Sequence, residues 1–227
     1  MKNGFLFTLL MAFLAASCEK KDRCPDVFEL PVQLSPVKKE YHVGDTISIV
    51  SKFHKEVKAF NYEGEYVNTI DMEGVEWLPV VDFNRLDTLT DTGKAAPSDF
   101  QTLCQFLKDT CCILDITNFS NGGNSLIGEY HFARDSFFLR YRLVLKKPGN
   151  YIVTHYSFNY AGSSPRDYPG KCPGQPGFNV NFRLNTGQDN NVDLLATSPE
   201  PFWSSYIYSD PNDGFYNRGR FCFKVLP

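Results

Sequence analysis

The sequence contains no hydrophobic run long enough to cross a bilayer as a helix, and it has no excess of basic residues. Its longest apolar stretch is residues 5–14, whereas a membrane-spanning helix needs roughly 18 apolar residues. Lysine and arginine number 23 against 26 aspartate and glutamate residues, so no basic surface for nucleic acid is expected. At 42% hydrophobic residues the chain is too apolar for intrinsic disorder. These absences leave a folded, weakly acidic protein without a nucleic-acid partner.

The sequence motifs that commonly mark enzymes are also missing. The patterns G-x-S-x-G, H-E-x-x-H, G-x-G-x-x-G and the P-loop do not occur. The four histidines are scattered among strand-like segments, and no two cysteines have the C-x-x-C spacing of zinc or redox sites. We therefore expect no catalytic residue, metal or cofactor. A hydrolase with a site built around the loop 161–177 stays open as an alternative.

The first seventeen residues have the layout of a bacterial secretory signal. Lys2 supplies a positive start, residues 5–14 form the apolar core, and three small residues precede Cys18. The segment 14–18, LAASC, resembles the lipobox of bacterial lipoproteins, in which the cysteine receives a diacylglycerol and becomes the first mature residue. Leu14 stands four places before the cysteine, one more than usual. A plain secretory signal with an incidental thiol is the alternative.

Five charged residues, 19–23, follow this cysteine and predict a solvated tether. The stretch 17–22, SCEKKD, resembles the start of lipoproteins from Bacteroidota-type Gram-negative bacteria, where charged residues behind the cysteine can signal surface export. The resemblance implies a protein anchored to the outer membrane, with the lipid bilayer as a partner through acylated Cys18. The lipidated N-terminus and tether, 18–26, would then carry a single domain, 27–227, on the periplasmic or the surface side.

The remaining six cysteines are an even number, which predicts up to three disulfides in an exported domain. Cys111 and Cys112 are adjacent and are expected to bridge to different partners. Local spacing favours a bond from Cys104 to one of these two. Cys222 lies in a strand-like segment and needs a distant partner such as Cys172 or Cys24. The six candidates are thus Cys24, Cys104, Cys111, Cys112, Cys172 and Cys222.

Alternating apolar and polar residues predict a strand-rich chain. The clearest strand is 137–145, whose odd-numbered residues are all apolar. The apolar segment 27–34 contains Pro31 and suits an edge strand. One helix is expected, capped by Ser98 and ending near Asp109. Further strands are expected at 46–53, 57–62, 66–70, 77–83, 113–119, 125–132, 151–158, 178–184 and 219–226.

This order of elements indicates an all-β sandwich with one short helix and long loops. The segment 147–151, KPGNY, lies between two strong strands and resembles the E–F corner of immunoglobulin-like domains, where a tyrosine after a glycine turn bonds back to the backbone. The segment 43–47, VGDTI, looks like the start of an early strand in bacterial immunoglobulin-like domains. The resemblance implies an immunoglobulin-like antiparallel sandwich. A jelly roll or a lipocalin-like barrel stays open, because the Cys-Trp-Cys core of antibody domains is absent.

Aromatic residues make up 15% of the chain, more than a sandwich core requires. Trp203 and Tyr206 stand close to the polar segment 210–214, and with Trp77 they are candidate platforms for a sugar or a partner protein. Packing of these rings beneath the loop 161–177 is the alternative. The segment 210–214, DPNDG, resembles half of a calcium loop, but it is better explained as a turn between two strands.

Two triplets, 45–47 and 87–89, resemble the Asp-Ser/Thr-aliphatic O-glycosylation sites of exported Bacteroidota proteins. They make Thr46 and Thr88 candidate acceptors, with Thr88 the better placed because it is expected in a loop.

The sequence as a whole favours a membrane-anchored envelope lipoprotein that acts as a non-enzymatic binding or assembly module. Other envelope proteins or glycans are its expected partners. The alternative is a carbohydrate-binding surface lipoprotein of a glycan-uptake system, which would use the aromatic side chains named above.

Overall fold

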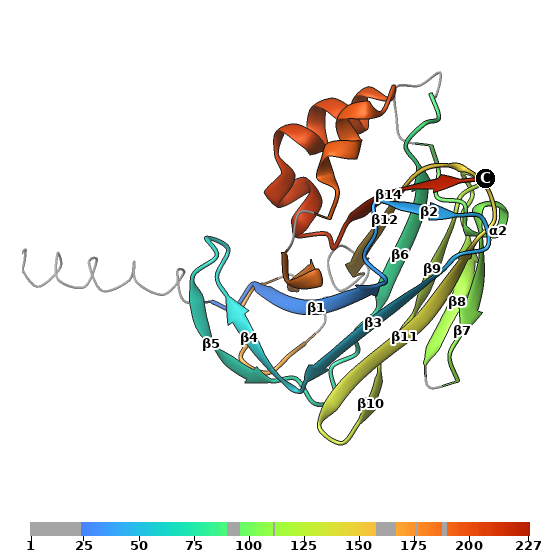
Figure 1. Cartoon of the computed structure of the whole chain (residues 1–227). Helices are drawn as coiled ribbons and strands as arrows, with labels where there is room; N and C mark the ends of the chain where they lie inside the picture. Colours follow the sequence, from blue (N-terminus) through green and yellow to red (C-terminus); the bar gives the residue numbers. More distant parts are fainter. Residues whose placement is uncertain (1–23, 90–95, 111, 158–166, 176, 188–189) are drawn as a thin grey trace, which may run out of the picture.

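A computed structural model of the chain describes residues 24–89, 96–110, 112–157, 167–175, 177–187 and 190–227. These residues form two β-sheets that pack face to face, with short helices beside one of them (Figure 1). The predicted all-β sandwich is confirmed. No helix among the described residues is both long enough and apolar enough to span a membrane.

The first sheet has the strand order β10-β11-β3-β1-β4-β5, with β13 paired to β1 and β7 paired to β11. All of its pairs are antiparallel except β1 with β13. Its strands are β1 (Val27–Ser35), β3 (Thr46–His54), β4 (Glu56–Phe60), β5 (Tyr66–Asp71), β7 (Cys104–Lys108), β10 (His131–Ala133), β11 (Ser136–Leu145) and β13 (Asn179–Leu184).

The second sheet has the order β2-β14-β12-β6-β9-β8. The pair β14 and β2 is parallel, so the sandwich is mostly rather than wholly antiparallel. Its strands are β2 (Glu40–His42), β6 (Pro79–Arg85), β8 (Ile113–Asn118), β9 (Asn124–Glu129), β12 (Gly149–Ser157) and β14 (Phe221–Leu226).

The core lies between the sheets and follows the predicted alternation. The odd-numbered residues of β11 from Phe137 to Leu145 are all buried, and so are Phe221, Phe223 and Val225 on β14. Burying side chains of this size stabilises the fold by about 1.5–3 kcal/mol each. The period of two read from the sequence therefore identifies the inner faces of both sheets.

The predicted tyrosine corner is confirmed at the turn between β11 and β12. The hydroxyl of Tyr151 donates to the carbonyl of Lys147 at 2.9 Å, and its ring stacks on Phe83 with the centroids 5.1 Å apart. Gly149 has a φ of +151° and its absent Cβ would lie 3.2 Å from the Tyr151 hydroxyl, so glycine suits this position. The motif fixes the turn between the two sheets.

The strand that contains Pro31 is an inner strand, so the expected edge position is wrong. β1 pairs with β13 on one side, and on the other with β4 at residues 27–28 and with β3 at residues 33–35. Pro31 lies between these two pairings, where a backbone N–H is not required for the ladder with β3 or β4. Its carbonyl accepts a hydrogen bond from the hydroxyl of Ser51 at 2.6 Å.

The helix predicted over 98–109 is wrong in both length and cap. Only α2 (Phe100–Leu103) is helical, and Asp99 rather than Ser98 caps it by accepting a 3.0 Å hydrogen bond from the N–H of Thr102. The chain then continues as β7, which pairs with β11. Pairing with the longest strand of the sheet overrides the helical spacing of the apolar residues.

Short helices cover the outer face of the second sheet, beside β12 and β14 (Figure 1). They are η2 (Val192–Thr197), η3 (Phe202–Ile207) and η4 (Asn212–Tyr216), preceded by η1 (Asn185–Gly187) after β13. The segment 210–214, expected as a turn between strands, leads into η4 instead. A second hydrophobic cluster lies under these helices, formed by Leu86, Ile152, Leu195, Trp203, Ile207, Phe215 and Cys222.

Candidate functional site

The two tryptophans predicted as binding platforms are buried. Trp77 is 2% exposed and lies in the core among aromatic rings that include Phe53, at a centroid distance of 5.4 Å. Trp203 is 3% exposed in the cluster under the helices, with the guanidinium of Arg220 5.8 Å from its ring. Neither ring offers a face to a ligand, because the core and the helical cover occupy both. The side chain of Tyr206 lies outside the described residues.

Up to three disulfides were predicted, and the pairings proposed for them are wrong. The described residues contain one disulfide, between Cys24 and Cys172, with the Cα atoms 5.8 Å apart. Cys104, Cys112 and Cys222 are buried thiols, so neither the local bond from Cys104 to Cys112 nor a bond from Cys222 to Cys24 or Cys172 is made. Cys111 lies outside the described residues. Burial raises the pKa of Cys104 to about 12, which keeps this thiol protonated.

The disulfide fastens the segment 167–175 to the chain just before β1. The carbonyl of Pro25 accepts hydrogen bonds from the Tyr168 hydroxyl at 2.6 Å and from Nε2 of Gln175 at 2.9 Å. The ring of Tyr168 packs edge-on against Phe28. These contacts make the start of β1 a fixed part of the domain, next to the groove described below.

The two glycosylation candidates lie at different kinds of site. Thr46 is the exposed first residue of β3. Thr88 is half-buried and follows Asp87, whose carboxylate accepts hydrogen bonds from Arg85 and from the N–H of Asn150. Both remain predictions. The described part of the chain has no group of three or more His, Cys, Asp or Glu side chains placed to hold a metal ion.

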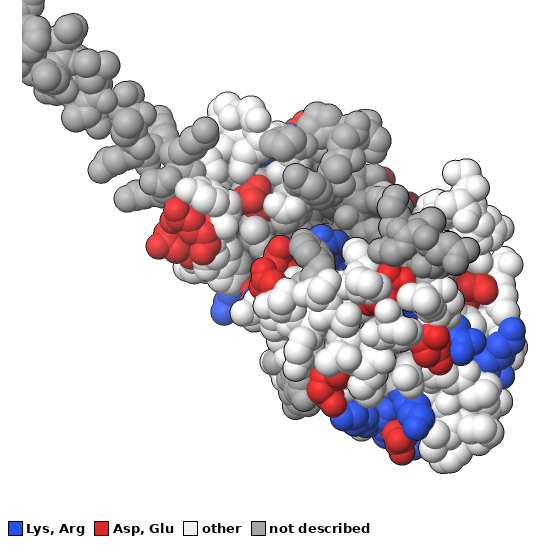
Figure 2. All heavy atoms as spheres, turned by 90° about the horizontal axis from the view of Figure 1, so that it is seen from above, with Lys and Arg blue, Asp and Glu red and all other residues white. Residues whose placement is uncertain are grey.

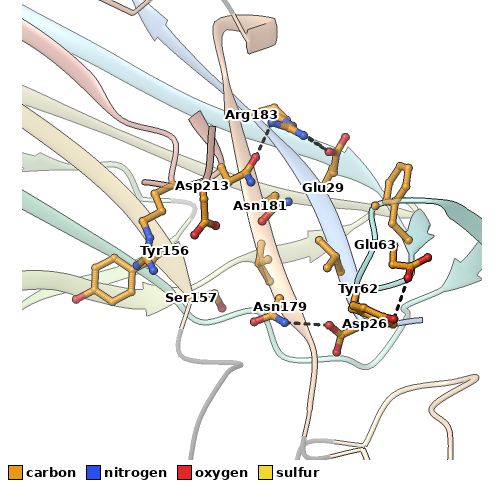
Figure 3. A pocket seen from close by; sticks show the side chains of 16 residues that line it. Asp26, Glu29, Tyr62, Glu63, Tyr156, Ser157, Asn179, Asn181, Arg183 and Asp213 are labelled. Atoms are coloured by element: carbon orange, nitrogen blue, oxygen red, sulfur yellow. Dashed lines mark hydrogen bonds and ion pairs between the residues drawn. The ribbon is translucent and has the colours of Figure 1, made fainter. Parts of the chain in front are cut away.

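A groove of about 880 Å³ runs along the outer face of β1 and β13 (Figure 3). One wall is the turn between β4 and β5, and the other consists of the end of β12 with η4 and the residues after it. The residues that line it are Asp26, Val27, Glu29, Phe60, Tyr62, Glu63, Gly64, Tyr156, Ser157, Asn179, Val180, Asn181, Arg183, Asp213, Asn217 and Arg218.

The floor of the groove follows from the alternation of β13, whose sequence is NVNFRL. Phe182 and Leu184 point into the core, so Asn179, Asn181 and Arg183 share the outer face. Alternate residues of a strand are about 6.6 Å apart, so these three span about 13 Å. The parallel register places Glu29 of β1 opposite Asn181. The result is a row of polar side chains on a rigid pair of strands.

Hydrogen bonds hold several of these side chains in place. Arg183 donates from Nε to Oε1 of Glu29 at 2.9 Å and from its first terminal nitrogen to Asn217 at 2.7 Å. Asn179 donates from Nδ2 to Asp26 at 3.2 Å. Figure 3 shows the contacts of Arg183 with Glu29 and of Asn179 with Asp26 as dashed lines, with Asn181 between Arg183 and Asn179. The groove is therefore organised before any ligand arrives.

The charge of the groove is mildly acidic. Four carboxylates, of Asp26, Glu29, Glu63 and Asp213, face the two guanidinium groups of Arg183 and Arg218. On the face shown in Figure 2, acidic and basic side chains lie in small separate groups rather than in one large patch of a single sign. Recognition in the groove thus depends on local hydrogen bonds more than on a long-range field.

Aromatic rings complete the groove at its rim. The ring of Tyr62 is 67% exposed, and its hydroxyl donates to Glu63 at 2.9 Å. Tyr156 is half-buried on the opposite wall and hydrogen-bonds to Asp82, whose pKa is raised by burial. The carboxylates, amides, guanidinium groups and rings together suit a polar ligand that has some apolar surface.

No protein-family model and no curated protein matches this chain. Among solved structures, it is similar to the reeler domain of human F-spondin, with 9% identity over 68% of this chain and 90% of that domain, at a TM-score of 0.31. It is also similar to a type II cohesin domain from the cellulosome of Acetivibrio cellulolyticus, with 11% identity over 68% and 91% of the chains, at a TM-score of 0.30.

The groove was not predicted from the sequence, because it contains neither tryptophan nor a catalytic motif. The available signal was the polar face of the strand predicted at 178–184, where two asparagines and an arginine alternate with core residues. A sheet face exposed to water explains such a pattern equally well. Only the placement of η4 and of the β4–β5 turn on either side turns that face into a groove.

Proposed function

We propose that this protein is a lipid-anchored lipoprotein of the bacterial outer membrane whose β-sandwich domain binds a partner in the groove along β1 and β13. The groove itself is the observation that supports this function most strongly. A volume of about 880 Å³ falls in the range of ligand sites, and the paired side chains of its floor are already ordered. Order before binding lowers the entropic cost of association. Binding or assembly, rather than catalysis, is the role proposed.

The anchor and the groove would lie close together. Six residue steps separate Cys18 from Cys24, so a fully extended tether reaches at most about 20 Å. Cys24 is bonded to Cys172, and Asp26 two residues later already lines the groove. A diacylated Cys18 would therefore hold one end of the groove near the membrane surface. Partners there are envelope proteins or glycans.

The test of the anchor uses the full-length protein in its own envelope. We expect mass spectrometry to find a diacylglycerol on Cys18 and fractionation to place the protein with the outer membrane. The variant Cys18→Ala should move to the soluble fraction, whereas Cys222→Ala should stay with the membrane. Equal partition of wild type and Cys18→Ala would contradict the anchor. Protease shaving of intact cells then shows whether the domain faces outward.

The test of the groove compares Arg183→Ala with Arg142→Ala on printed arrays of oligosaccharides and of peptides. Arg142 is exposed on β11 of the same sheet and does not line the groove. We expect the array signals of the wild type to fall at least tenfold in Arg183→Ala and to persist in Arg142→Ala. Array signals that are the same for the wild type and Arg183→Ala would overturn the proposed binding function. An array without any signal would overturn it as well.

A further inference from the structure

We infer that the groove binds a neutral saccharide, an inference that rests on the proposed binding function. The first reason is that charged side chains of the floor already have hydrogen-bond partners within the protein. The carboxylate of Glu29 is satisfied by Arg183, and that of Asp26 accepts from Asn179. A charged ligand would have to compete with these internal partners, whereas a neutral one adds hydrogen bonds without breaking them.

The second reason is the hydrogen-bonding capacity that the floor retains. A guanidinium group has five N–H donors, and the hydrogen bonds of Arg183 to the described residues use its Nε and both terminal nitrogens once each, which leaves two donors. The amide of Asn181 makes no hydrogen bond to the described residues and keeps its two donors and its carbonyl. Asn179 keeps one N–H and its carbonyl.

These groups form a row of hydrogen-bond donors and acceptors about 13 Å long on β13. Each hydroxyl of a sugar both donates and accepts, so adjacent hydroxyls match adjacent donors and acceptors on such a row. An extended peptide also alternates N–H donors and C=O acceptors, but it places charged or apolar side chains between them. The row therefore favours a polyol, and its length suits a short oligosaccharide.

The third reason is the ring of Tyr62 at the rim. It is 67% exposed, and its hydroxyl is held by Glu63, so an aromatic face stands beside the polar floor. Sugar rings have an apolar face of C–H groups that packs on exposed aromatic rings. A polar floor with an aromatic side platform is the combination that a sugar ring requires.

The acidic charge of the groove favours neutral glycans over anionic ones. Four carboxylates against two guanidinium groups disfavour sulfated, phosphorylated or uronic-acid-rich glycans. Neutral hexose and pentose polymers carry no such penalty. A cationic peptide is the remaining competitor, because Asp213 makes no hydrogen bond to the described residues and Glu63 is exposed.

The experiment is titration calorimetry of the mature domain with three probes: neutral oligosaccharides of glucose, mannose, xylose and galactose, a heparin fragment, and oligolysine. We expect at least one neutral oligosaccharide to bind, with an affinity that changes less than twofold between 50 and 500 mM salt. Asn181→Ala and Tyr62→Ala should each weaken it at least tenfold.

Matched controls separate a local effect from unfolding. The control variants are Asn118→Ala and Tyr208→Ala. Asn118 is an exposed residue of β8, Tyr208 is an exposed residue after η3, and neither lines the groove. Both variants should bind the oligosaccharide as the wild type does. Oligolysine binding that salt abolishes and Asp213→Asn weakens would overturn the saccharide and leave the groove as a peptide site. Heparin binding would also overturn it. If no probe binds, the saccharide inference is overturned. The peptide array described above then tests whether the groove binds any partner.

Discussion

Arg183 on β13 donates two hydrogen bonds to the same carboxylate oxygen of Glu29 on β1, one from Nε at 2.9 Å and one from a terminal nitrogen. The contact joins the two parallel strands that form the floor of the groove. The side chains are 37% and 32% exposed, so water screens the pair and its contribution to stability is small, at most about 1 kcal/mol. We therefore expect the main effect of this ion pair to be on the geometry of the groove.

Substitution Arg183→Lys tests this expectation. Lysine keeps the charge but loses the planar fork that reaches Glu29 and Asn217 together. We expect the free energy of unfolding in urea to change by less than about 1 kcal/mol, while binding of any groove ligand weakens at least tenfold. Arg142→Lys on β11 is the control. A large loss of stability with unchanged affinity would show that the pair is structural.

The disulfide between Cys24 and Cys172 should contribute substantially to stability. It joins residues 148 apart in sequence, and closing a long loop restricts the unfolded chain. We expect Cys24→Ser to lower the free energy of unfolding by about 2–5 kcal/mol. Reductant should destabilise the wild type by a similar amount and leave Cys24→Ser unchanged. An unchanged free energy of unfolding of the wild type in reductant would contradict the assignment of this disulfide.

The buried thiols allow a direct check of the cysteine assignment. Burial raises the pKa of Cys104 to about 12, and the thiolate is the form that reacts with iodoacetamide. We expect no alkylation of Cys104 in the native domain at pH 8. Denaturation without reductant should expose Cys104, Cys112 and Cys222 to labelling, and peptide mass spectrometry should find them modified. Unlabelled cysteines after denaturation would mean that they form disulfides.

The stability of the domain should fall in mild acid because of His155. Its ring is buried, with Nε2 2.8 Å from the Tyr141 hydroxyl and Nδ1 2.9 Å from the carbonyl of Gly219. Burial lowers its pKa from 6.5 to about 4. Between these values the unfolded chain binds a proton that the native domain excludes, so stability decreases as the pH falls from 6.5 to 4, by up to about 3 kcal/mol.

Urea unfolding of the wild type and of His155→Gln at pH 7.5 and 4.5 isolates this contribution, since the other titrating groups are common to both proteins. We expect the wild type to lose about 2–3 kcal/mol more than the variant between the two pH values. Identical losses would show that His155 is protonated in the native domain or is not buried.

Most of the fold could be predicted from the sequence, because alternating burial leaves a period of two. Strand β11 was identified in this way, whereas the corner at Tyr151 was identified from the resemblance of its segment to immunoglobulin-like domains. Residues 104–108 were not identified as a strand, since their apolar spacing fits a helix and only pairing with β11 makes them a strand. The inner position of β1 was missed for the same reason: strand neighbours are set by tertiary structure, not by local sequence.

The candidate site could be predicted much less well. Exposed tryptophan is a sound general signal for a binding surface, but Trp77 and Trp203 fill hydrophobic clusters, and a sequence does not state which rings are covered. An even cysteine count likewise does not tell thiols from disulfides when three cysteines are small core residues. The groove depends on the spatial meeting of β13, η4 and the β4–β5 turn, which are far apart in the chain.

Backbone hydrogen exchange of the mature domain tests the groove most directly, measured with and without a saturating neutral oligosaccharide. We expect slower exchange in three separate segments, 62–64, 179–183 and 213–218, and no change in β8. Protection confined to another region, such as 202–208 around Trp203, or protection in none of the three segments, would contradict the groove as the binding site.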